Sequence, residues 1–113
     1  MGKKILTGAD ILAGCKVAEA EFELGSGVIK VRGMTKDVQL RARKNATVNG
    51  EFDSDALEIA IFKAGIVEPT LTDEELVQIK ATMPAATFDA VVLEVMRLSG
   101  VDVKDFAKQA KKS

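Results

Sequence analysis

The sequence contains no histidine, no tryptophan and no tyrosine, and it has a single cysteine, Cys15. Without histidine, the chain lacks the commonest general base and the commonest protein ligand of transition metals. One cysteine cannot form a disulfide within the chain, which fits a reducing compartment. Because no histidine is present to activate Cys15, we expect an inert thiol rather than a nucleophile.

Signals of cofactor binding and of membrane insertion are also missing. There is no glycine-rich phosphate-binding motif, and the acidic residues Asp53, Asp55 and Glu58 lack the glycine and the later glutamate of a calcium loop. No apolar run approaches the roughly 20 residues that span a bilayer. The apolar part of the N-terminus is too short for a signal peptide, and acidity follows too soon. We therefore expect no enzymatic activity, no cofactor, no metal and no membrane partner.

What remains is an ordinary globular composition, with 113 residues, 47% hydrophobic residues and a net charge of −1. This length suits one domain with one core. With only five phenylalanines as aromatics, the core must be mainly aliphatic. We expect a single domain over residues 1–113, divided into a β-hairpin part (1–34) and a helical part (35–113).

A β-hairpin is predicted over residues 16–32. Residues 16–24 alternate between apolar side chains and three glutamates. After a Gly-Ser-Gly turn, residues 28–32 alternate again, now with basic residues between the apolar ones. Opposite charges would then face each other across the solvent side. Because an isolated hairpin is marginal in water, it must pack on helices or pair with a strand of another subunit.

Helix start and stop signals predict an α+β fold that is mostly helical. A short helix is expected near residues 9–12, after Thr7. The main helices are expected at about 36–46, 53–64, 72–82, 84–99 and 102–110.

The clearest signals belong to the predicted helices 72–82 and 84–99. Thr72 and Glu75 have the spacing of a capping box, and Gly100 fits a left-handed helix stop. The residue before Pro84 is pushed away from helical geometry, which separates the two helices. Apolar residues recur every three or four positions in the second helix. We expect the rest of the chain to pack around this pair.

Charge is segregated along the chain, with a basic stretch at residues 30–44 and an acidic one at 51–75. The favoured interpretation is that these are solvated helix faces, with the acids serving as caps. A second interpretation is complementary ends that dock copies head to tail. A third is a nucleic-acid patch, but the stretch has no interleaved aromatic residues and the domain is not basic. We therefore expect no nucleic-acid partner.

The order of motifs resembles a known family. An acidic start at 51–53 is followed by an apolar helix, by VEPTLTDEEL at 67–76, by Met83-Pro84 and by RLSGVD at 97–102, before a lysine-rich end. The first half adds KKILTGADILA at 3–13 and VRGMT at 31–35. This pattern is similar to the tail assembly chaperones of long-tailed phages, the XkdN-like group. It departs at residues 84–86, where a glycine is expected after the proline.

The resemblance implies a non-enzymatic protein that keeps the tape-measure protein soluble and recruits tail-tube subunits during tail morphogenesis. It implies self-association, residence in the host bacterial cytoplasm and absence from the mature virion. A longer frameshifted form is also implied, because Lys111 and Lys112 are compatible with a slippery A-rich codon run. The alternative is a small nucleic-acid-binding regulator that uses residues 30–44.

We expect partner contacts at apolar or methionine positions near helix ends, where flexible side chains adapt to a binding surface. Met96 also fits a core position. These residues are Met34, Val38, Leu71, Leu76, Met83, Phe88, Met96 and Phe106.

Overall fold

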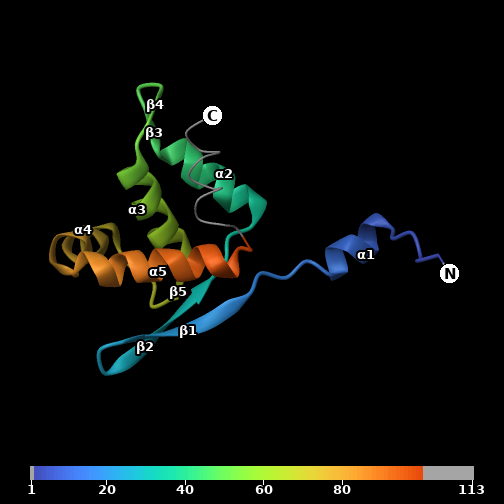
Figure 1. Ribbon diagram of the computed structural model, residues 1–113, viewed down its shortest axis with the longest axis horizontal. Coiled ribbons are helices and arrows are strands. Elements are labelled where there is room, and N and C mark those ends of the chain that lie inside the picture. The colour runs from blue at the N-terminus through green and yellow to red at the C-terminus, as the bar shows by residue number, and fades with distance from the viewer. Residues whose placement is uncertain (1, 101–113) are drawn as a thin grey trace.

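The computed structural model describes residues 2–100 and has an α+β fold (Figure 1). The elements are α1 (Gly8–Ala13), β1 (Glu19–Leu24), β2 (Gly27–Arg32), α2 (Lys36–Asn45), β3 (Thr47–Val48), β4 (Glu51–Phe52), α3 (Ser54–Gly65), β5 (Ile66–Glu68), α4 (Asp73–Thr82) and α5 (Ala85–Leu98). The predicted fold class, the hairpin and the four main helices before residue 100 are confirmed. The helix predicted over 102–110 lies outside the described residues.

The hairpin has the predicted register and charge pairing. β1 runs antiparallel to β2, with Glu19 opposite Arg32 and Glu21 opposite Lys30. The alternate residues of β1 are half-buried while its glutamates are exposed, as a strand with one covered face requires. β5 pairs antiparallel with the other edge of β2 and completes a sheet of order β1-β2-β5. The third strand therefore comes from the same chain.

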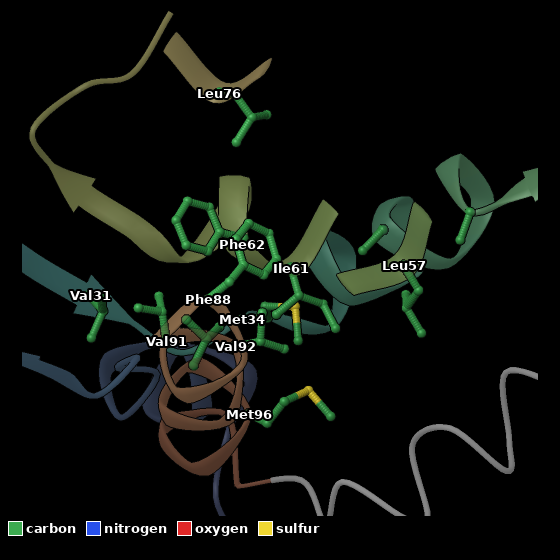
Figure 2. Close-up of a cluster of buried hydrophobic side chains, with 13 residues drawn as sticks. Val31, Met34, Leu57, Ile61, Phe62, Leu76, Phe88, Val91, Val92 and Met96 are labelled. Carbon is green, nitrogen blue, oxygen red and sulfur yellow. The ribbon is translucent and has the colours of Figure 1, made fainter. Parts of the chain in front are cut away.

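The core lies where α5 crosses the sheet and packs against α3 (Figures 1 and 2). The rings of Phe62 and Phe88 stack with centroids 4.2 Å apart and planes 5° from parallel. Val31 of β2 is fully buried beside them, so hairpin and helices share one core. The residues that α5 buries are Phe88, Val91, Val92, Val95 and Met96.

The sequence predicts α4 and α5 as the central pair of helices, and the structure corrects this prediction. The central pair is α3 and α5, because α3 buries the large residues Leu57, Ile61 and Phe62. α4 buries only Leu76, which lies at the edge of the core cluster in Figure 2. A helix with a single buried residue can cover a core but cannot organise it.

Local capping explains where the helices begin. Thr35, Asp53 and Thr72 each accept a hydrogen bond from a backbone N–H in the first turn of α2, α3 and α4. At Thr72 the full capping box is present, because the Glu75 side chain also accepts from the Thr72 N–H at 3.0 Å. Gly100 has φ +73°, the left-handed stop that the sequence predicts.

Two short strand pairings differ from the sequence interpretation. The segment around Asn49 and Gly50 reads as a loop, but it is the tight turn of the β3–β4 hairpin. Both residues have positive φ, as a two-residue hairpin turn requires. β5 has only three residues and follows α3 directly, so no period-two pattern marks it.

The N-terminal arm, defined as residues 2–17, projects away from the body (Figure 1). It carries α1, which begins at the predicted cap Thr7. The Thr7 hydroxyl accepts from the Asp10 N–H, and the Asp10 carboxylate accepts from the Thr7 N–H at 3.0 Å. No residue of α1 is buried, so its support is local: the capping hydrogen bonds and an exposed ion pair between Lys4 Nζ and Asp10 Oδ2 at 3.7 Å. Separately, none of the helices within residues 2–100 combines the length and apolar character needed to cross a bilayer.

Candidate functional site

The predicted partner-contact residues do not form one surface. Met34, Leu76, Phe88 and Met96 are buried, each with at most 9% of its surface exposed. Three others are half-buried against the core, namely Val38, Leu71 and Met83. Phe106 lies outside the described residues. Most of these residues therefore hold the fold together, and their contact with a partner stays a prediction.

Met83 and Phe88 nevertheless reach one hollow, which we call the acid-flanked groove. It has a volume of about 430 Å³ and lies between α3, α4 and α5. Its apolar lining comes from Ile59, Met83, Ala85 and Phe88, and its charged lining from Asp55, Glu58, Lys80 and Asp89. An apolar floor with charged edges suits an amphipathic protein segment better than a small polar substrate.

The electrostatics of this groove favour a binding partner with a cationic side chain. Burial raises the pKa of the Glu58 carboxyl, and the nearby carboxylates of Asp89 and Asp55 raise it further. Each of these three influences opposes the negative charge of Glu58. A lysine or arginine arriving at the rim would relieve the repulsion.

A second hollow, which we call the basic hollow, lies between α2, α3 and the sheet. It has a volume of about 460 Å³ and includes the cations Arg32, Arg41 and Lys63. Arg41 pairs with Asp37 one turn earlier in α2. Lys63 Nζ lies 2.9 Å from Asp73 Oδ1, which ties α3 to the start of α4. Two of its three cations are thus engaged with carboxylates of the chain, so the hollow offers less positive charge to an anion than its composition indicates.

The N-terminal arm carries four exposed large apolar side chains, among them the two most exposed of the described residues, Ile5 and Leu12. The exposed fractions are 91% for Ile5, 57% for Leu6, 55% for Ile11 and 74% for Leu12. Surface apolar residues are normal one at a time, but four on a projecting segment of sixteen residues indicate an interaction site. These four residues were not among the contacts predicted from the sequence, although one Ile-Leu pair precedes the cap Thr7 and the other lies within α1.

The described residues offer no arrangement typical of catalysis. Within residues 2–100, no group of three or more His, Cys, Asp or Glu side chains is placed to hold a metal ion. The exposed Cys15 donates its Sγ–H to the Ile11 carbonyl at 3.2 Å. The two hollows and the apolar side chains of the arm are features that can contact another protein.

Comparison of the chain with protein-family models, with curated proteins and with solved structures found no match.

Proposed function

We propose that this protein is a phage tail assembly chaperone, which binds the tape-measure protein and tail-tube subunits during tail morphogenesis. The observation that carries the proposal is the ordered series of motifs from residue 51 to residue 102. In this function the protein makes and breaks no covalent bond. It works in the host bacterial cytoplasm, associates with copies of itself and is left out of the mature virion.

One of the two parts of the chain with the strongest resemblance, residues 67–76, leads into α4 and does not itself line the acid-flanked groove. It supplies the end of β5, the cis Glu68–Pro69 bond and the capping box that starts α4. α4 in turn brings Lys80 and Met83 to the groove. The resemblance and the groove are therefore linked through the placement of α4.

The groove supports a shielding role in physical terms. A tape-measure protein is a long apolar helical client, and its exposed stripe must be covered until the tail tube encloses it. A helix laid in the groove would place apolar side chains against Ile59, Met83 and Phe88. Basic residues on the flanks of such a helix would meet the acidic rim. Several copies along one client would cover it without any chemical step.

The test is co-expression with the tape-measure gene product of the same phage. We expect the wild-type chain to keep the client soluble and to co-purify with it. The Ala85→Glu variant places a charged side chain in the groove at the first turn of α5, where a negative charge suits the helix dipole. We expect the Ala85→Glu variant to recover several-fold less client than the wild type does.

The matched control is Ala86→Glu, which adds the same charge one residue later at an exposed position outside the groove lining. It should behave as the wild type does. A client that stays insoluble and separate from the wild-type chain would end the proposal. Equal client recovery with Ala85→Glu and Ala86→Glu would leave the chaperone function in place but would put the client-binding site outside the groove.

A second candidate is a small nucleic-acid-binding regulator, and the basic hollow is the observation that favours it. Binding to phosphates weakens steeply as salt rises, because each neutralised phosphate releases counterions. We expect no retention on DNA at physiological salt, since Arg41 and Lys63 already pair with carboxylates. Retention that an Arg32→Ala variant abolishes and that falls with salt would favour this candidate instead.

A further inference from the structure

We propose that the N-terminal arm of one copy docks in the acid-flanked groove of a second copy. This inference concerns the chain alone and stands without any client.

The arm lacks the support that a short helix needs. Isolated helices shorter than about 12 residues are marginal in water, and α1 has only six residues. A capping box fixes its start, yet none of its residues is buried against the body. Ile5, Leu6, Ile11 and Leu12 remain exposed. A helix that is capped locally but has no apolar contact is suited to fold fully on a partner surface.

The arm and the groove match in charge. The arm contains three lysines and one aspartate, so its net charge is +2. The groove lining contains three carboxylates and one lysine, so its net charge is −2. Lys3 and Lys4 directly precede the apolar pair Ile5 and Leu6, so basic and apolar side chains would reach the groove together. Lys4 Nζ lies 3.7 Å from Asp10 Oδ2 in an exposed ion pair, which Lys4 would exchange for the acidic rim on docking.

The groove also has an electrostatic reason to accept a lysine. The carboxyl of Glu58 faces Asp55 on its own helix and Asp89 on α5, while Lys80 on α4 is the cation of the lining. With three carboxylates and one lysine, the rim carries an excess of negative charge. Lysines from another copy would supply the missing charges, and the pairs would form at the edge of an apolar contact.

The position of the arm favours a second copy as the occupant. The arm leaves the body at the C-terminal end of α5, where Lys16 and Val17 line a hollow together with Leu98 and Ser99. The groove is at the other end of α5, next to Ala85 and Phe88. The fourteen residues of α5 separate the two by about 20 Å. In Figure 1 the arm points away from α4 and continues outward from the body.

The arm and the groove lie at opposite ends of α5, so docking the arm of one copy in the groove of another makes a head-to-tail contact. Such an interface uses two different patches, so it produces an open row of copies, or a ring if the rotation closes. Each added copy presents a new free groove and a new free arm. The size of the assembly is therefore expected to grow with protein concentration.

The experiment is analytical ultracentrifugation of the purified full chain at low and high salt. We expect the wild type to self-associate in a concentration-dependent way and to dissociate partly as salt rises. Two variants each reverse the charge on one side of the contact. Lys3→Glu/Lys4→Glu changes the arm, and Glu58→Lys/Asp89→Lys changes the groove. Each should weaken association about tenfold or more, because attraction becomes like-charge repulsion at two positions.

Mixing the two variants gives the sharpest result. The acidic arm of one variant fits the basic groove of the other, and the unchanged basic arm of the second fits the unchanged acidic groove of the first. We therefore expect the mixture to form rows of alternating variants that grow with concentration, although each variant alone is monomeric. All four changes in one chain should restore the concentration-dependent association. Glu23→Lys/Glu51→Lys is the control, because it changes the net charge as the groove variant does, at exposed sites outside the groove.

Circular dichroism and urea midpoints that match the wild type show that the variants fold. A wild type that stays monomeric, including one whose arm docks in its own groove, would overturn the proposal. The proposal would also be overturned if neither charge reversal weakened association, or if the two variants did not associate with each other when mixed. Failure of this test leaves client binding by the same chain to its own experiment, so the two proposals can fail separately.

Discussion

Gly65 in α3 and Val95 in α5 approach each other so closely that no side chain fits between them. A Cβ on Gly65 would lie 2.2 Å from Cγ2 and 2.8 Å from Cγ1 of Val95. Val95 is completely buried, so it has no free space into which to move. Gly65 is the last residue of α3, and its lack of a side chain lets α3 and α5 touch.

This contact predicts that Gly65→Ala destabilises the fold, although alanine is normally the better helix former. Overpacking of a rigid core typically costs about 1–3 kcal/mol. Urea unfolding followed by circular dichroism measures the change. Gly27→Ala is the control, since a Cβ there meets no atom within 4 Å and the backbone does not have positive φ. A Gly65→Ala variant as stable as this control would mean that α3 and α5 are farther apart.

Ser99 joins the end of α5 to the segment after β2. Its Oγ accepts from the Met34 N–H at 2.7 Å and donates to the Val95 carbonyl at 2.7 Å. Ser99→Ala leaves the Met34 N–H without this partner in a partly buried place. The expected loss is about 1–3 kcal/mol of unfolding free energy. Ser26→Ala, in the exposed turn between β1 and β2, should change the urea midpoint little.

Thr72 controls the start of α4. Thr72→Ala removes the hydrogen bond that the hydroxyl accepts from the Glu75 N–H at 3.1 Å, while the backbone N–H of residue 72 keeps its bond to the Glu75 carboxylate. Cap losses cost about 0.5–2 kcal/mol. Because α4 buries only Leu76, we expect the loss to appear as faster amide exchange confined to this helix. Thr70→Ala changes an exposed threonine that caps no helix and should leave exchange unaltered. Faster exchange throughout α3 and α5 would show that α4 is more tightly coupled to the core than we infer.

The raised pKa of Glu58 predicts a pH-dependent effect of Glu58→Gln. Burial and the neighbouring carboxylates raise this pKa above its usual value of 4.5. A carboxyl whose folded-state pKa is raised stabilises the fold fully below its unfolded-state pKa, and this stabilisation is lost as pH rises through the folded-state pKa. At neutral pH the glutamine variant should therefore be slightly more stable than the wild type, and at low pH the difference should vanish.

The measurement is thermal unfolding across the acidic pH range, at protein concentrations too low for self-association. The same substitution should weaken association between copies at neutral pH, since it removes an acid from the groove rim. Opposite signs for folding and association distinguish a rim residue from a residue that only supports the fold. A glutamine variant that is less stable at neutral pH would show that Glu58 has a favourable partner.

The sequence predicted those features whose causes are local. The caps at Thr7 and Thr72 lie within one turn of the groups they satisfy, so their spacing is visible in the chain. The alternation in β1 and β2 likewise reports one covered face and one wet face. β5 was missed because three residues are too few to show a period, and they become a strand only through pairing with β2.

The candidate site was predicted less well than the fold. Met83 and Phe88 were singled out and do line the groove, but Ile59, Asp89 and the apolar arm were not. The groove is made of side chains from three helices that are up to 34 positions apart, from Asp55 to Asp89. No local pattern can report which of these residues meet.

The sequence by itself determined where the chain turns, where helices start and stop, and which faces of the hairpin are wet, because these depend on hydrogen bonds and apolar spacing between near neighbours. Only the tertiary structure decided that α3 rather than α4 is the partner of α5, that Gly65 makes room for Val95, and that an apolar arm is left without cover. These outcomes depend on how the shapes of distant segments fit, and shape complementarity is a property of the packed surfaces rather than of the order of residues.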